Sequence, residues 1–225
     1  MALLGAGAVA IWHDLVPEGR ENFYDWHGRE HMPERVGIPG FRRGRRYAAI
    51  DAPLAYFNLY EAETPDVVSG PDYLERLNNP TPWTLTSVKD FRDVARSICK
   101  VAASFGEGQG GLIMTCCYDI SDADSDRHVA ALKGDLLPRL AADPIIAGAH
   151  LLVADEEASA VDSTERKARG IKNRVPRWIV LVECWADETP FADLCATALG
   201  DEALAATGAT GPIERGLYRL QTTAV

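Results

Sequence analysis

Hydrophobic and polar positions alternate along several short stretches of this chain, and the stretches recur in the same order in its two halves. Residues 7–15 and 111–120 are apolar runs rich in strand-forming residues, and each run contains an Asp near its end. Because a similar pattern continues downstream of both runs, the sequence predicts an internal repeat. The further strands that match between the halves are residues 45–51 and 149–155, 54–64 and 176–189, and 95–104 and 216–223.

Turn-forming prolines and helical patterns occupy equivalent places between these strands. Pro33 in the first half aligns with Pro138 in the second, and a helical pattern follows the third strand in each half. Each half therefore runs strand, helix, strand, strand, helix, strand, which is the split βαβ order. We expect an α+β chain of two tandem ferredoxin-like repeats (βαββαβ), residues 1–108 and 109–225, packed sheet to sheet around a core or cavity.

Composition narrows the functional classes. The 225 residues carry a formal net charge of −10, which argues against a general nucleic-acid-binding protein. No apolar run approaches the roughly 20 residues that a membrane-spanning helix needs, so no membrane partner is expected. The N-terminal stretch indicates a strand rather than a signal peptide, and the five cysteines have no regular spacing. We therefore expect a cytoplasmic protein without disulfide bonds. Two fused repeats are compatible with either a monomer or a homodimer.

The first helical segment carries the most informative chemistry. Phe23, His27 and His31 recur every four residues, which places both imidazoles on one face of a helix beside a large apolar side chain. Pro33 is expected close to the end of this helix, because proline disrupts a helix interior. An imidazole has a pKa near neutrality and is suited to moving protons.

Three interpretations of this histidine pair remain open. Both side chains can be hydrogen-bonded packing residues. Both can bind a metal, because residues 27–31 read His-Gly-Arg-Glu-His, but a catalytic zinc needs a third protein ligand and none is evident. Acid–base catalysis is the third interpretation, with His31 as general acid or base and His27 as the residue that orients it.

Residues 23–41, FYDWHGREHMPERVGIPGF, resemble the signature of EthD-like proteins in the dimeric α+β barrel superfamily. The resemblance rests on aromatic residues on the first helix, a His two residues before a Pro, and a Pro-Gly-apolar turn before the second strand. It implies a dimeric α/β-barrel arrangement in which His31 faces a cavity between sheet and helices. Relatives include isomerases, small monooxygenases, cyclases and haem-binding enzymes. Because Leu136 stands at the position equivalent to His31, the site is expected in the first half alone.

Further candidate residues surround this signature. Alternation along the second strand puts Arg43 and Arg45 on one face, where either can bind a carboxylate or protect a sheet edge. Tyr47 either lines the cavity or belongs to the core. Trp83, which directly follows the two prolines around Thr81, either walls the pocket or seals the barrel. Tyr24 completes the predicted substrate-binding set. The sequence does not decide which strand face points into the cavity.

Residues 156–175 form an insertion that the first half lacks, and they are rich in Lys and Arg. The segment is either a solvated charged loop or a basic flap that attracts an acidic substrate or closes over a site.

The leading hypothesis is a small-molecule binding protein or cofactor-independent enzyme, of the isomerase, lyase or cyclase type, that uses His31 as general acid or base. No cofactor or metal is expected under this hypothesis. A haem- or metal-binding protein with His27 or His31 as ligand is one alternative. A non-catalytic binding or assembly module is the other.

Overall fold

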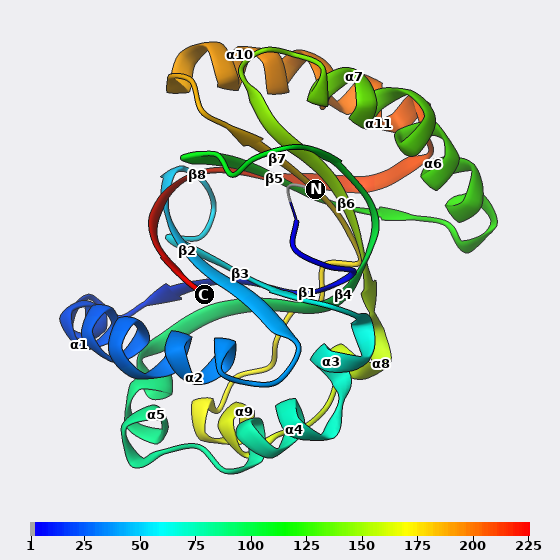
Figure 1. Ribbon diagram of the computed structural model, residues 1–225. Coiled ribbons are helices and arrows are strands. Elements are labelled where there is room, and N and C mark those ends of the chain that lie inside the picture. The colour runs from blue at the N-terminus through cyan, green and yellow to red at the C-terminus, as the bar shows by residue number, and fades with distance from the viewer. Residues whose placement is uncertain (1–2) are drawn as a thin grey trace.

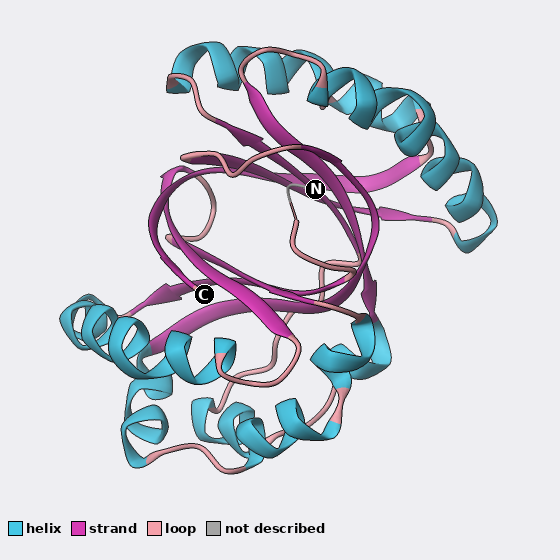
Figure 2. Ribbon diagram, viewed as in Figure 1, coloured by secondary structure: helices cyan, strands magenta, loops and turns pink. Residues whose placement is uncertain are grey.

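The computed structural model describes residues 3–225 and shows a closed barrel of eight antiparallel strands, with helices packed outside it on two opposite sides (Figures 1 and 2). The strands are β1 (Gly7–Leu15), β2 (Phe41–Asp51), β3 (Tyr56–Ala62), β4 (Phe91–Gly106), β5 (Leu112–Ile120), β6 (Ile146–Asp155), β7 (Trp178–Cys184) and β8 (Ala209–Ala224). Their order around the barrel is β1-β3-β2-β8-β5-β7-β6-β4. The predicted α+β class and the two ferredoxin-like halves are confirmed.

Each half contributes one four-stranded sheet, β4-β1-β3-β2 from the first and β6-β7-β5-β8 from the second. The two sheets join at both edges, because β2 pairs with β8 and β4 pairs with β6, so neither sheet has a free edge. Side chains fill the interior between them. Trp12, Tyr47 and Phe57 from the first half pack there with Ile179 and Tyr218 from the second, forming one apolar cluster. The barrel is therefore a packed core and not a pore.

Helices cover the outer face of each sheet (Figure 1). Over the first sheet lie α1 (Arg20–Trp26), α2 (Met32–Val36), α3 (Pro65–Ser69), α4 (Pro71–Asn78) and α5 (Pro82–Ser87). Over the second lie α6 (Ser125–Ala131), α7 (Leu137–Ala141), α10 (Glu188–Ala198) and α11 (Asp201–Ala206). The insertion contributes α8 (Glu156–Ser159) and α9 (Thr164–Arg169), which lie with the helices of the first half. Among the described helices none is long and apolar enough to cross a membrane.

A π-helical turn interrupts the first helix of each half at the same place. His27–His31 links α1 to α2, and Leu132–Leu136 links α6 to α7. In each turn a backbone N–H donates to the carbonyl five residues earlier, Met32 to His27 and Leu137 to Leu132. A proline follows directly in both halves, and the wider turn accommodates a ring that would clash in a regular α-helix. The first helix therefore continues past Pro33 and ends at Val36, so Pro33 lies close to its end, as predicted.

Candidate functional site

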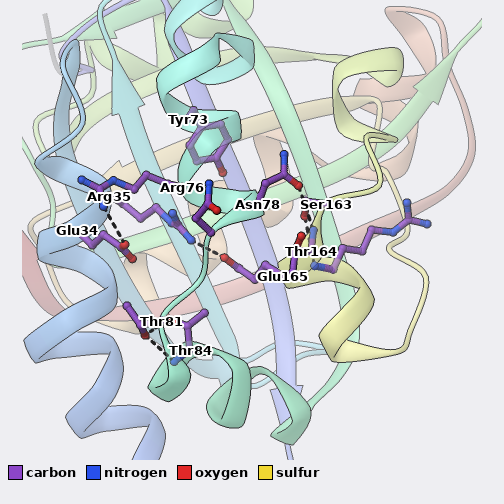
Figure 3. A network of polar contacts seen from close by, with 12 residues as sticks. Glu34, Arg35, Tyr73, Arg76, Asn78, Thr81, Thr84, Ser163, Thr164 and Glu165 are labelled. Atoms are coloured by element: carbon purple, nitrogen blue, oxygen red, sulfur yellow. Dashed lines mark hydrogen bonds and ion pairs between the residues drawn. The ribbon is translucent and has the colours of Figure 1, made fainter.

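An enclosed cavity of about 40 Å³ lies between the outer face of the first sheet and the helices that cover it. Its walls come from the first helix, from β3 and β4, from α4 and from the insertion that carries α9. Figure 3 shows how polar contacts tie α2, α4 and α9 together beside it. The insertion at residues 156–175, predicted to be either a solvated loop or a flap, therefore covers the cavity of the first half.

His31 is the cavity residue whose hydrogen-bonding capacity is least satisfied. Its side chain lines the cavity, is 7 % exposed and packs on Trp26 with ring centroids 4.4 Å apart. Its Nδ1 atom is buried and has no hydrogen-bond partner within residues 3–225. Burial, together with the positive charge of Arg35, holds the pKa of His31 well below its usual value. His31 is therefore a neutral imidazole at physiological pH, with a lone pair available to accept a proton.

His27 also lines the cavity but has both ring nitrogens engaged. Arg46 Nη1 lies 3.4 Å from His27 Nδ1, and because a guanidinium can only donate, Nδ1 is the acceptor. The ring hydrogen then resides on Nε2 and is donated to the Tyr60 hydroxyl at 3.2 Å. The two imidazoles are 5.5 Å apart between centroids, so His27 contacts His31 by packing. Burial and the Arg46 charge lower the pKa of His27, which is also neutral.

His13, on β1, is the third imidazole of this layer. It is fully buried, stacks on Tyr56 and has Nε2 3.1 Å from the Asn58 amide nitrogen. Burial is the main cause that lowers the pKa of His13 to about 3. Since His13, Asn58 and Tyr60 all point to the helices, this strand face is the one that meets the cavity, which alternation alone left open.

Arginines supply the charge around these neutral imidazoles. Arg35, Arg96 and Arg169 line the cavity from α2, β4 and α9. Arg35 is 3 % exposed and forms an ion pair with Glu165 on α9. Burial alone would lower the pKa of Arg35, but the charge of Glu165 together with Tyr73, Glu34 and Tyr60 outweighs burial and raises that pKa. Burial lowers the pKa of Arg169 to about 10, so it remains protonated at neutral pH.

Arg35 is the cavity residue that a stricter sequence analysis could have found. It continues the four-residue spacing of Phe23, His27 and His31, and therefore shares their helix face. Arg96 had no such signal because alternation alone did not say which face of β4 meets the cavity, and Arg169 had none because only the folding of the insertion onto β4 brings it there.

Three of the predicted substrate-binding residues lie elsewhere, which corrects the expectation that they shape the histidine pocket. Arg43, Arg45 and Tyr47 point into the barrel, on the opposite face of β2 from Arg46. Alternation is the reason: residues two apart share a face, and the even-numbered Arg46 is the one beside His27.

Inside the barrel, Arg45 joins the two halves through carboxylates at equivalent positions. Its guanidinium lies 2.9 Å from Glu61 and 2.6 Å from Glu183. Arg43 binds the same Glu61 through Nε and Nη2, both at 2.8 Å. Burial would raise the pKa of Glu183, but the charge and hydrogen bond of Arg45 together with His150 outweigh burial and lower that pKa to about 2. These groups form a buried ionic network on the far side of the sheet from the cavity.

Tyr24 and Trp83 pack around the first helix, and neither contributes to the cavity wall. The Tyr24 hydroxyl is 3.2 Å from that of Tyr56, and Arg46 lies over the Tyr24 ring. Trp83 donates its indole N–H to Asn22 at 2.8 Å. Thr81 is extended and caps α5, so Pro82 and Trp83 lie in the first turn of that helix. Trp83 therefore stabilises the helix layer.

The residues do not fit the metal or haem alternatives. Within residues 3–225 no three His, Cys, Asp or Glu side chains are grouped to hold a metal. Glu30, the acid of the His-Gly-Arg-Glu-His string, instead accepts a hydrogen bond from Thr81 at 2.6 Å. A haem needs an apolar slot for its ring system, whereas the first-half cavity is rich in arginine. The equivalent region of the second half is packed with Leu132, Leu136 and Leu140.

Comparisons with solved structures identify the type of fold. An anthrone oxidase-like protein is 12% identical, with a TM-score of 0.65, covering 97% of this chain and 92% of that chain. A putative monooxygenase from Lactobacillus acidophilus is 11% identical, with a TM-score of 0.60 over 97% of this chain and 96% of that chain. A putative chlorite dismutase is 11% identical, with a TM-score of 0.56 over 97% of this chain and 96% of that chain. This chain therefore has the dimeric α+β barrel fold.

Neither the protein-family models nor the curated proteins match this sequence. At sequence identities of 11–12%, the similarity to these structures establishes the fold and not the activity. The chemistry of the cavity therefore provides the basis for inferring the activity.

Proposed function

We propose that this protein is a cofactor-independent enzyme acting on a small molecule, with His31 as the general base of a proton transfer in the helix-side cavity. The observation that carries the proposal is the buried, unpartnered Nδ1 of His31 facing a cavity with arginine walls. A non-catalytic module would have no use for a cavity beside this ring, and its structural histidines would have hydrogen-bond partners, as His128 has in Tyr118 and Thr207.

The proposed reaction begins with a substrate that has an acidic C–H next to a carbonyl group. His31 Nδ1 accepts the proton, which leaves an enolate and an imidazolium. The cationic Arg35 and Arg169 stabilise the negative oxygen in a site with little water, where such charges act strongly. Return of the proton to a different carbon completes an isomerisation, and no electron acceptor is needed. Lyase and cyclase reactions begin with the same carbanion.

A cofactor-independent oxygenation is the second candidate, because similar structures bear the names of an anthrone oxidase-like protein and a monooxygenase. In that reaction the carbanion adds dioxygen to give a hydroperoxide. Loss of water then converts the original CH₂ to C=O. Both candidates share the first proton transfer, so one experiment on that step tests both.

The test uses anthrone, whose CH₂ is acidic, under anaerobic conditions in D₂O. Exchange of its methylene hydrogens for deuterium, followed by mass spectrometry, should be accelerated by the protein. His31→Gln should reduce the enzyme-dependent rate by about 100-fold or more, which is the usual contribution of a general base. Admission of air then separates the candidates, because only oxygenation consumes dioxygen.

Arg29→Gln is the matched control, because Arg29 lies on the same π-helical turn with a side chain that is 79% exposed. It should leave the exchange rate unchanged. An exchange rate that His31→Gln leaves intact, in a variant with a native circular dichroism spectrum, would rule out His31 as the base.

A further inference from the structure

The insertion of the second repeat is fastened at both ends over the cavity of the first. Near its start, Ser159 accepts a hydrogen bond from the Ile98 backbone at 2.9 Å. Near its end, Arg174 pairs with Val94 of β4 at 3.0 Å. Between these points α9 crosses the cavity, with the Thr164 N–H bound to the Asn78 side chain (Figure 3). The insertion therefore forms the outer wall of the site.

Glu165 is the one carboxylate among the described residues that line this cavity. Its side chain is 13% exposed and pairs with Arg35 Nη2, as Figure 3 shows. The cations exceed this single negative charge, since Arg35, Arg96 and Arg169 all contribute to the wall. Two buried donors, Arg35 Nη1 and Arg169 Nε, have no hydrogen-bond partner within residues 3–225. The closed cavity thus holds more buried cationic donors than acceptors, an arrangement that favours a further anionic oxygen.

The closed cavity is too small for an organic substrate. Its volume of about 40 Å³ holds about three water molecules, whereas ligand pockets measure roughly 300–1,000 Å³. The strands and the first helix are tied into the barrel, whereas α9 spans six residues between the two fastened ends. Because α9 forms the outer wall, its displacement would enlarge the site and would also remove Glu165 from Arg35.

We propose that Arg35 and Arg169 bind the anionic group of an aromatic carboxylate substrate, and that Glu165 occupies this subsite until the substrate displaces it. The inference rests on the proposed function for the location of the site, and it adds the substrate class. Trp26 and Phe91 supply the apolar wall for an aromatic ring. The substrate's carboxylate replaces that of Glu165 beside Arg35. Opening of α9 therefore exchanges the Arg35–Glu165 ion pair for an ion pair between Arg35 and the substrate.

The test measures equilibrium binding of two fluorescent probes, 1-hydroxy-2-naphthoate and the uncharged 1-naphthol. Glu165→Ala removes the internal competitor and should tighten naphthoate binding by about tenfold, which corresponds to 1.4 kcal/mol. Binding of 1-naphthol should not change by more than about twofold. Asp162→Ala is the matched control, because Asp162 is an exposed acid of the same insertion that pairs with Arg166 and not with Arg35.

Naphthoate binding that tightens equally in Glu165→Ala and Asp162→Ala would overturn the proposal, because the effect would then come from the change in net charge alone. Weaker naphthoate binding in Glu165→Ala, or no saturable naphthoate binding in either variant, would overturn it as well. The measurement is independent of catalysis. Tight, Glu165-dependent binding without deuterium exchange would uphold the anion subsite and count against the proposed enzyme, whereas exchange without such binding would do the reverse.

Discussion

Glu183→Ala is expected to lower the free energy of unfolding by about 3 kcal/mol, because the buried Arg45 loses one of its two carboxylates and keeps only Glu61, which Arg43 also binds. Arg45 and Glu183 are both 0% exposed, and their 2.6 Å contact connects the two halves across the barrel. Water does not reach the Arg45 guanidinium to compensate for the lost carboxylate. Thermal unfolding followed by circular dichroism should show a midpoint lowered by on the order of 10 °C.

The control removes both charges. In Arg45→Met combined with Glu183→Leu no unpaired ion is left, and Glu61 keeps its two hydrogen bonds from Arg43. The double variant should recover at least half of the lost stability, because apolar side chains of similar volume replace buried ion pairs with little cost. If Glu183→Ala lost less than about 1 kcal/mol, the network would have no structural importance.

Acid should unfold this protein unusually steeply, because His13, His27 and His31 are buried and uncharged in the folded state. In the unfolded chain each imidazole binds a proton near pH 6.5, whereas in the folded chain each pKa is lowered. These histidines therefore leave the free energy of unfolding undiminished above pH 6.5, and they lower it as the pH falls below 6.5. Each histidine contributes a slope of about 1.4 kcal/mol per pH unit, so the three together give about 4 kcal/mol per unit.

Urea unfolding at pH 7.5, 6.5 and 5.5 measures this slope. His31→Gln should reduce the limiting slope by about 1.4 kcal/mol per pH unit, and Arg29→Gln should leave it unchanged. A free energy of unfolding that stays constant from pH 7 to pH 5 would show that these imidazoles are not buried in the neutral form.

The repeat made the fold predictable from the sequence. Matching strands and the aligned Pro33 and Pro138 were enough to predict two ferredoxin-like halves. The π-helical turn was not predicted, because no periodicity in the sequence indicates a turn widened by one residue. It nevertheless lies at the same place in both halves, directly before each proline.

The site was predictable only where its residues share one helix. Spacing placed His27 and His31 on a common face, and both line the cavity. Tyr47 and Arg45 were assigned to the same pocket because alternation pairs the residues of a strand face but does not say which face is inside the barrel. Arg169 and Glu165 come from the other repeat, about 130 residues further along the chain. Their position depends on the path of the insertion, which local sequence does not encode.

Ligand binding in the helix-side cavity beside His31 can be followed directly through the five histidines of the chain. Their ring signals can be followed by nuclear magnetic resonance during addition of 1-hydroxy-2-naphthoate. We expect the signals of His31 and His27, which line the cavity, to shift until binding saturates. The signals of His128 and His150, in the second half, should stay in place. Shifts confined to His128 and His150, or no shifts at all, would contradict binding in this cavity.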